Sequence, residues 1–291
     1  VYDSWVDLIQ APNTNAICIG TWPYMHCTLV LAALKHDKHV LTEARMAMNT
    51  AESHIMLNAS RKHPDLVSQI VPAPHTLKVD RIIKDLIANG YLGRILSVDL
   101  TWHQGGFIDY NSPMTWRLDR NFSGYNTMQM GIWYEAMMRW IGPATSVLSI
   151  TKTNVATRSY NNSDSHFITI PDHIEIICEM ASGPLVHMRF SAVTGLAPTD
   201  QLWFFGTEGT LRLDVPTMRL YGGRRGEDQL SEIEIPDEKQ GHWRVEEEFV
   251  NAIRGLEPVS LTTFEDGVRY MEFTEAVARS AQSGNRIHLP L

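Results

Sequence analysis

The chain has 291 residues, of which 44% are hydrophobic and 20% are charged, and its formal net charge is −8 at pH 7. These proportions are typical of a globular protein, and the length suits either two domains or one large domain. The acidic balance argues against a nucleic-acid partner, because phosphate backbones select a basic protein face. The sequence contains no run of 18 apolar residues, so we expect no membrane span.

Three cysteines are scattered along the chain, at Cys18, Cys27 and Cys178. Cys18 and Cys178 lie in apolar runs and are predicted to be buried thiols. A Cys/His metal site needs more ligands than Cys27 and its neighbour His26, so no metal site is predicted. So few cysteines favour a reducing compartment, and no basic-then-apolar leader is visible at the N-terminus, so we expect a cytoplasmic protein.

The first 90 residues alternate between predicted strands and predicted helices, after a short helix at Asp3–Gln10. The predicted strands are Asn15–Gly20, His39–Thr42 and Leu66–Val71, and the predicted helices that follow them are Tyr24–His36, Thr50–Lys62 and Leu77–Asn89. The first of these strands is an apolar run of the kind buried on both faces of a sheet. Strict alternation of strand and helix predicts a parallel sheet with right-handed crossovers.

The pattern changes after Gly93. A strand at Ile95–Trp102 precedes a loop at Gln104–Pro113 and a helix at about Thr127–Ile141. Between residues 146 and 236 several alternating strands are separated by turn residues, and this pattern predicts a largely antiparallel sheet. The predicted turns are Ser182-Gly183-Pro184, Glu208-Gly209 and Gly222-Gly223, and the predicted terminal helices are Arg244–Arg254 and Phe264–Ser283.

The expected fold class is therefore α/β, with two domains. Residues 1–92 are expected to form one domain with a partial parallel sheet. Residues 93–291 are expected to form an α+β domain with a large open antiparallel sheet. The C-terminal helices of the second domain could pack back on the first.

Three stretches carry a resemblance to a known family. They are 21–47 (TWPYMHCTLVLAALKHDKHVLTEARMA), 89–98 (NGYLGRILSV) and 123–142 (SGYNTMQMGIWYEAMMRWIG). The first retains Pro23, His26, Ala33, Leu34, Lys38 to Leu41 and Glu43 of a "TP…H…AL…GKHVL…EKP" pattern. Together with GTEGTLRL at 206–213 and with residues 249–258, their order and spacing resemble the Gfo/Idh/MocA oxidoreductases.

That resemblance implies that residues 1–92 are the C-terminal part of a Rossmann-like nucleotide-binding domain that holds NAD or NADP. It implies that residues 93–291 are a substrate and oligomerisation domain. It also implies reversible hydride transfer at a hydroxyl carbon of a sugar, polyol or hydroxy acid. The residues implied beside the nicotinamide are Thr21, Trp22, Pro23, His26, Glu43 and Ala44. The partners implied are a small-molecule substrate and a second copy of the chain, bound through the open sheet.

The sequence departs from the family first in its phosphate-binding turn. A dinucleotide fold needs a glycine turn after its first strand, and no G-x-G-x-x-G occurs in these residues. We therefore expect NAD or NADP only if such a turn precedes Val1. Without that first strand, Asn15–Gly20 would present a free edge. We expect either a longer protein or a partner subunit that covers this edge.

The second departure concerns the residues that transfer the proton. The family lysine of "EKP" is replaced by Ala44, and on the motif helix the family aspartate and histidine are replaced by Gln129 and Trp133. Oxidation of an alcohol needs a base, and none of these three side chains can serve as one. Because Gln129 and Trp133 are four residues apart, they are expected to share a helix face and to bind a ligand by stacking and hydrogen bonding.

Other residues are candidates for the lost roles, each with an alternative. Arg45 could clamp a carboxylate or phosphate, or form a surface ion pair. Arg117 is expected to contact the ligand from the loop before the motif helix. His75 could titrate in the site or serve as a capping or surface residue. Glu135 could be a base, although its place off the Gln129–Trp133 face favours a solvated role.

Three classes of function remain open. The first is an oxidoreductase linked to NAD or NADP, with an altered base. The second is a non-redox enzyme on the same scaffold, such as a lyase, an isomerase or a hydrolase, which the loss of the lysine and histidine favours. The third is a binding protein without catalysis. His103, His173 and His187 are expected to have core or surface roles rather than to bind a metal.

Overall fold

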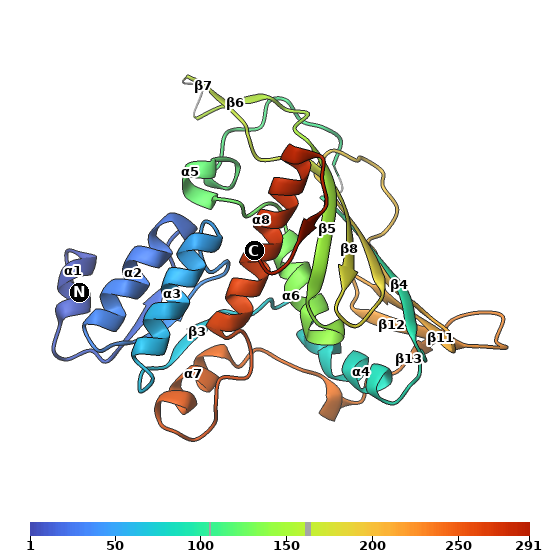
Figure 1. Ribbon diagram of the computed structural model, residues 1–291, viewed down its shortest axis with the longest axis horizontal. Helices are drawn as coiled ribbons and strands as arrows, with labels where there is room; N and C mark the ends of the chain where they lie inside the picture. The colour runs from blue at the N-terminus through green and yellow to red at the C-terminus, as the bar shows by residue number, and fades with distance from the viewer. Residues whose placement is uncertain (105, 161–163) are drawn as a thin grey trace. The chain divides into compact units, whose positions relative to one another are not determined.

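The computed structural model describes residues 1–104, 106–160 and 164–291 (Figure 1). The chain divides into two compact units that interleave along the sequence. Unit 1 comprises Val1–Pro72, Arg120–Asn126 and Arg244–Glu275, and unit 2 comprises Ala73–Asp119, Thr127–Trp243 and Ala276–Leu291. The domain boundary expected near residue 93 stays a prediction.

Unit 1 is built on a three-stranded parallel sheet in the order β1-β2-β3, which confirms the predicted Rossmann-like pattern. Its strands are β1 (Ala16–Ile19), β2 (His39–Thr42) and β3 (Ser68–Ile70). Its helices are α1 (Trp5–Gln10), α2 (Pro23–Lys35), α3 (Thr50–Lys62), α5 (Arg120–Ser123) and α7 (Val245–Ile253), with the first half of α8 (Phe264–Ser283).

Local sequence explains why these helices begin where they do. The Ser4 hydroxyl accepts a hydrogen bond from the backbone N–H of Asp7 at the start of α1. Asn49 likewise caps α3, because its side chain accepts a bond from the backbone N–H of Glu52. Pro23 occupies the first position of α2. A backbone N–H at this position has no partner within the helix, so proline, which lacks one, is well tolerated there.

Strand β1 corrects two predictions. Ile17 and Ile19 are buried, but Cys18 between them is exposed, so the strand is covered on one face rather than on both. The prediction that Cys18 is a buried thiol is therefore wrong, whereas Cys178 in unit 2 is buried as expected. Among the described residues, β1 pairs only with β2.

Unit 2 contains a nine-stranded sheet in the order β13-β12-β11-β10-β4-β9-β8-β5-β14. All neighbouring pairs are antiparallel except β4 and β9, so the predicted, largely antiparallel sheet is confirmed. The strands are β4 (Ile95–His103), β5 (Ala144–Lys152), β8 (His173–Met180), β9 (Leu185–Ser191), β10 (Gln201–Gly206), β11 (Gly209–Asp214), β12 (Arg219–Arg224), β13 (Ser231–Ile233) and β14 (Ile287–His288).

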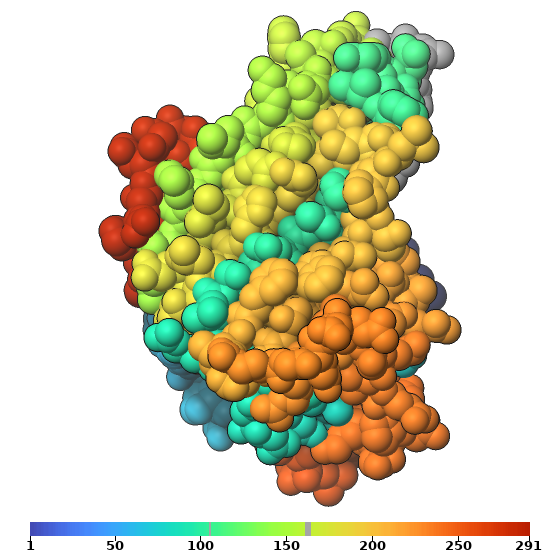
Figure 2. All heavy atoms as spheres, turned by 90° about the vertical axis from the view of Figure 1, so that its right-hand side faces the viewer, coloured from blue at the N-terminus to red at the C-terminus, as the bar shows by residue number. Residues whose placement is uncertain are grey.

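One face of this sheet carries the core of unit 2, and the other lies open. Val98, Leu100, Val186, Met188 and Phe190 alternate with more exposed residues along β4 and β9 and are fully buried. Figure 2 shows the other face, where side chains of the central strands lie at the surface uncovered by a helix. This alternation is typical of an antiparallel sheet with one solvated face.

The remaining elements of unit 2 flank the sheet. They are α4 (Leu77–Ala88), η1 (Trp116–Leu118), α6 (Met130–Ile141), η2 (Asp237–Lys239) and the two-stranded sheet of β6 (Thr157–Ser159) and β7 (Ser165–Phe167). No helix within the described residues is long and apolar enough to cross a membrane.

The prediction of a hairpin turn at Gly222-Gly223 is wrong, because both residues lie inside strand β12. They are needed there for space rather than for turning. A Cβ atom on Gly222 would lie 2.6 Å from the Tyr91 hydroxyl, and one on Gly223 would lie 3.0 Å from Leu230. Glycine in a strand interior often marks such a close approach.

Candidate functional site

The carboxyl ends of β1 and β2 form one exposed edge of unit 1. The chain continues from β1 into Gly20, Thr21 and Trp22, and from β2 into Glu43 and Ala44. A Cβ atom placed on Gly20 would meet nothing within 4 Å, so the space in front of β1 is open. Open α/β sheets bind their ligands at this edge, outside the carboxyl ends of the strands.

His26 fastens together the two loops that follow these strands. Its ring lies in α2 and is fully buried. The Nε2 atom lies 2.9 Å from the carbonyl oxygen of Thr21, and the Nδ1 atom lies 3.0 Å from that of Arg45 and 3.3 Å from that of Met46. His26 therefore fixes the position of the loop after β1 relative to the loop after β2.

Replacement of His26 by leucine is expected to lower the free energy of unfolding by about 1–3 kcal/mol, because buried carbonyl groups lose their partner. Urea denaturation of the two proteins measures the difference. His36→Leu is the matched control, because His36 is exposed just after the same helix. Equal losses for the two variants would show that the bonds of His26 contribute nothing specific.

Arg45 is buried, so the alternative of a surface ion pair is wrong for this residue. Its guanidinium carbon lies 4.7 Å from the centre of the Tyr270 ring, a favourable cation–π distance. The Tyr270 hydroxyl in turn accepts a hydrogen bond from the backbone N–H of Met46 at 2.6 Å. These contacts fix the loop after β2, and a role of Arg45 toward an anion stays a prediction.

In unit 2, Gln129 and Trp133 mark the beginning of α6. Gln129 occupies the N-cap position, and its carbonyl oxygen accepts a bond from the backbone N–H of Trp133 at 3.1 Å. The Trp133 side chain is 1% exposed, and its indole N–H has no hydrogen-bond partner among the described residues. A buried donor without a partner is costly, so it calls for an explanation.

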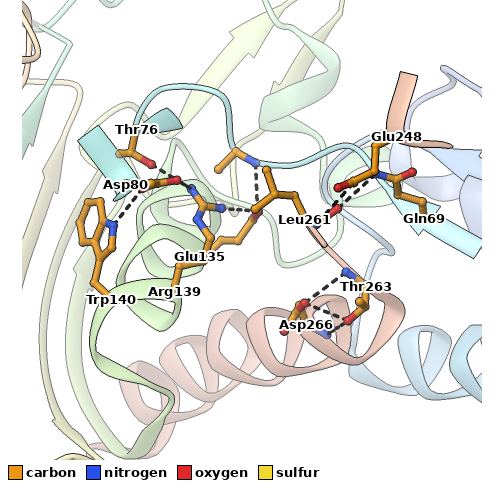
Figure 3. Close-up of polar contacts among 11 residues, drawn as sticks. Gln69, Thr76, Asp80, Glu135, Arg139, Trp140, Glu248, Leu261, Thr263 and Asp266 are labelled. Carbon is orange, nitrogen blue, oxygen red and sulfur yellow. Dashed lines mark hydrogen bonds and ion pairs between the residues drawn. The ribbon is translucent and has the colours of Figure 1, made fainter. Parts of the chain in front are cut away.

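Glu135 is not solvated, contrary to prediction, but belongs to a buried ion cluster (Figure 3). Its carboxylate accepts bonds from the backbone N–H of Ala73 at 3.0 Å and from Arg139 at 2.9 Å. Arg139 also lies 2.9 Å from Asp80. The indole N–H of Trp140 donates to Asp80 at 2.9 Å. One guanidinium thus lies between two carboxylates and joins α6 to α4.

The titration of Asp80 should be visible in the stability of the protein. Burial raises the pKa of Asp80 above its ordinary value of 3.8, against the opposing effects of Arg139 and of hydrogen bonds from Thr76 and Trp140. Because the folded state holds this proton more tightly, the contribution of Asp80 to stability is present at low pH and is lost as pH rises through the raised pKa.

We therefore expect Asp80→Asn to remove part of the fall in unfolding free energy that occurs above pH 3.8. Denaturation curves of both proteins across that pH range measure the difference. The same pH slope in the two proteins would contradict this assignment. Asp109→Asn is the control with the opposite sign, because hydrogen bonds from Ser112 and Asn111 lower the pKa of Asp109.

Two further predicted residues lie in exposed segments of unit 2. His75 is exposed just before α4, so a surface position is confirmed and a titrating role stays a prediction. Arg117 is exposed in η1, with its guanidinium carbon 4.3 Å from the centre of the Trp116 ring. The loop that precedes η1 is anchored by Arg158 of β6, a residue that the sequence analysis did not single out. Its guanidinium donates to the carbonyl groups of Ser112 and Asp109 at 2.7 and 3.0 Å.

The three strand histidines contact carboxylates, as expected for structural or surface residues. His103 lies 2.8 Å from Asp200, and His187 and His173 lie 2.9 and 3.4 Å from Glu175. Within the described ranges, no group of three or more His, Cys, Asp or Glu residues could hold a metal ion. Burial raises the pKa of the Cys27 thiol to about 11, which keeps it protonated at neutral pH.

The structure therefore gathers one set of predicted residues at a single edge and leaves the others in separate segments. Thr21, Trp22, Pro23, Glu43 and Ala44 all lie at the carboxyl edge of the unit 1 sheet. Gln129 and Trp133 lie together at the start of α6. His75 and Arg117 belong to other segments of unit 2. Whether these residues act on a ligand stays a prediction.

Comparison with known proteins gives the chain a family. Residues 1–70 match the oxidoreductase family with an NAD-binding Rossmann fold, and residues 81–212 match the GFO/IDH/MocA C-terminal domain. Levoglucosan dehydrogenase of Pseudarthrobacter phenanthrenivorans is 29% identical over 41% of this chain and 30% of its own length. The NADP(+)-dependent D-xylose 1-dehydrogenase of Haloarcula marismortui is 25% identical over 73% of this chain and 57% of its own length.

These matches span less than two thirds of either curated relative. Among solved structures, levoglucosan dehydrogenase in complex with NADH and L-sorbose superposes with a TM-score of 0.87, at 21% identity, over 99% of this chain and 83% of that one. The oxidoreductase domain protein from Kribbella flavida gives 0.86 at 20% identity, over 99% and 84%. The fold is shared, and the chain belongs to the Gfo/Idh/MocA family of oxidoreductases.

Proposed function

We propose that the protein is an oxidoreductase linked to NAD or NADP that oxidises a hydroxyl carbon of a sugar or a related small molecule, or reduces the corresponding carbonyl. The observation that carries the proposal is the exposed carboxyl edge of the parallel sheet, in a chain whose first 70 residues match an NAD-binding Rossmann family. Relatives named as dehydrogenases of levoglucosan and D-xylose support the sugar class.

The residues at this edge fit the nicotinamide half of a dinucleotide. A Cβ atom on Gly20 would meet nothing within 4 Å, and Thr21 and Pro23 follow β1 at this edge while Glu43 follows β2. His26 would act by positioning, since both of its ring nitrogens are engaged by loop carbonyl groups. No G-x-G-x-x-G turn of the kind that holds a pyrophosphate occurs in these 291 residues.

A nicotinamide held at this edge would supply the hydride acceptor for the carbon that bears the hydroxyl group, and the hydroxyl proton would have to leave to a base or to water. Ala44, Gln129 and Trp133 cannot take that proton. We propose that the indole N–H of Trp133, which has no hydrogen-bond partner in the described part of the chain, donates a hydrogen bond to a substrate oxygen. Arg117 and His75, both exposed, are the proposed charged and titrating contacts, and Gln129 and Arg45 are proposed to assist binding.

Thermal unfolding of the full-length protein with each of NAD⁺, NADH, NADP⁺ and NADPH tests cofactor binding. A ligand at 100 times its Kd is expected to stabilise the folded state by about 2.7 kcal/mol, which raises the melting temperature measurably. We expect at least one of the four to do so. Unchanged melting with all four would contradict the proposal.

A non-redox enzyme on the same scaffold is the second candidate. Ala44 and the buried Trp133 favour it, because the family resemblance places them where a lysine and a histidine are expected. Turnover that persists after all nicotinamide has been removed would support it. Strict dependence on nicotinamide would eliminate it, and the absence of any turnover would favour a binding protein.

We also propose that the protein is cytoplasmic and forms a homo-oligomer through the open face of the nine-stranded sheet. The location is supported by three cysteines that are all free thiols. The assembly is supported by large apolar side chains exposed on strands β5, β8 and β9, namely Leu148, Ile150, Ile177 and Leu185. Analytical ultracentrifugation of Ile150→Lys and of the unchanged protein tests this assembly. We expect the variant to sediment as a smaller species, and equal sedimentation of the two proteins would contradict the proposed interface.

A further inference from the structure

Three aromatic side chains meet at the carboxyl edge of unit 1. The centre of the Phe122 ring lies 5.1 Å from that of Trp22 and 5.3 Å from that of Tyr24, both in edge-to-face arrangements. The Trp22 and Tyr24 rings are 6.3 Å apart. Trp22 and Tyr24 flank the first residue of α2, and Phe122 lies in α5, which is drawn beside α2 in Figure 1. We call these three residues the aromatic platform.

Local structure fixes the platform. Pro23, between Trp22 and Tyr24, restricts the backbone at the start of α2. Phe122 is held by the turn that follows it, where the backbone N–H of Tyr125 donates to the carbonyl oxygen of Met48 at 2.8 Å. The Asn126 amide donates to the carbonyl oxygen of Ala47 at 2.9 Å. The platform is thus a rigid surface built from two distant parts of the chain.

The platform is exposed although it is aromatic. Trp22 and Tyr24 each retain 43% of their surface in solvent. The Trp102 and Phe190 pair, by contrast, serves the core, and both of these residues are buried. Rigid aromatic side chains clustered at a ligand-binding edge are typical of a recognition surface, because they offer a large contact area with little loss of side-chain entropy.

We propose that the aromatic platform stacks against the apolar C–H face of the sugar substrate. The inference rests on the proposed function, and it assigns a role that the sequence comparison did not. Hydride transfer requires the reacting carbon to lie about 3–3.5 Å from the nicotinamide. The sugar must therefore lie beside the loop that follows β1, and Trp22 belongs to that loop.

The chemistry of the platform suits the C–H face of a sugar and disfavours an anion. The three side chains carry no formal charge, and the faces of aromatic rings bear partial negative charge. Carbon atoms bonded to hydroxyl oxygens polarise their C–H bonds, so these hydrogens carry partial positive charge and are attracted to a ring face. The hydroxyl groups at the rim of the same sugar remain free for polar contacts elsewhere.

The test uses the full-length protein, with levoglucosan, D-xylose and L-sorbose as probe sugars. Trp22→Ala and Tyr24→Ala are both expected to raise the KM for the best probe by about five- to tenfold. Tyr24 lies outside the residues placed beside the nicotinamide, so Tyr24→Ala should leave kcat nearly unchanged, since stacking is lost equally from ground and transition states. Trp22→Phe should restore most of the affinity. Trp5→Ala is the matched control, because Trp5 is also 43% exposed and lies in α1 of the same unit.

Two further measurements separate the platform from the redox proposal. The first is the Kd for NADH, which should stay within about twofold of the original in Tyr24→Ala, because Tyr24 is not among the residues placed beside the nicotinamide. The second is direct binding of the probe sugars by calorimetry, which needs no turnover. Sugar binding that weakens in Trp22→Ala but not in Trp5→Ala supports the platform even if no redox reaction is found.

Three outcomes would overturn the inference. They are an unchanged KM and Kd for sugar in both alanine variants, a loss that falls on NADH instead, and the absence of binding by every probe sugar. A protein that binds sugars through the platform but shows no nicotinamide-dependent turnover would refute the proposed function alone.

Discussion

Replacing Arg139 by methionine is expected to lower the free energy of unfolding by about 3–5 kcal/mol, because it leaves two buried carboxylates without their cation. Glu135 is 2% exposed and the Asp80 side chain is 10% exposed, so water cannot take the place of the guanidinium. Methionine keeps much of the aliphatic length of arginine, so the decrease in unfolding free energy reports the lost charge more than lost packing. Denaturant unfolding of both proteins at neutral pH measures it.

The matched control is Arg61→Met. Arg61 pairs with Glu265 at 3.2 Å, but the two side chains are 60% and 47% exposed. An exposed pair of this kind contributes about 0–1 kcal/mol. A loss for Arg139→Met no larger than that of Arg61→Met would show that the cluster between α4 and α6 is not a buried ion network.

The second large effect is expected for Gly124→Ala. Gly124 has a φ of +63°, and a Cβ atom there would lie 2.0 Å from the carbonyl oxygen of Met48. The backbone has to move, so the 120–126 segment should separate from the loop after β2 and shift Phe122. We expect a loss of more than about 2 kcal/mol in unfolding free energy, together with a raised KM for the substrate.

Gly255→Ala controls for backbone conformation alone. Gly255 has a similar φ of +69°, but a Cβ atom there meets nothing within 4 Å. Gly255→Ala should lower the free energy of unfolding by about 1 kcal/mol, because alanine is disfavoured in the left-handed backbone conformation. If Gly124→Ala costs no more than Gly255→Ala, the close approach to Met48 is not a constraint, and the argument for a rigid platform weakens.

Local signals in the sequence were sufficient for most elements of the fold. Short apolar runs predicted the three parallel strands, and His39–Thr42 agrees with β2 at both ends. A polar residue suited to capping stood at either position 49 or position 50, and the structure shows that Asn49 is the cap of α3. Both signals act over a few residues, which is why the sequence alone reveals them.

The errors share one cause, since each depends on a residue far away in the chain. Glu135 resembles a solvated helix residue in the sequence. In the structure its carboxylate accepts a bond from the backbone N–H of Ala73, and its partner Arg139 also pairs with Asp80. Gly222 resembles a turn residue until Tyr91 is found at its Cβ position. Periodicity within one segment carries no information about such partners.

The candidate site shows the same division. The family pattern located Thr21, Trp22 and Pro23 at the edge of the sheet, where they lie. Phe122 escaped notice because it reaches Trp22 from a segment about a hundred residues further along the chain. The platform becomes visible only when α5 is placed beside α2.

Transfer of a deuterium label tests the central claim of a nicotinamide-linked sugar oxidoreductase most directly. A sugar deuterated at the reacting carbon is incubated with the full-length protein and oxidised cofactor, and the cofactor is analysed by mass spectrometry. Hydride transfer predicts one deuterium in the nicotinamide ring for each sugar molecule that is oxidised, while the hydroxyl proton goes to solvent. Product formed with no label in the cofactor would contradict the account and favour non-redox chemistry on this scaffold.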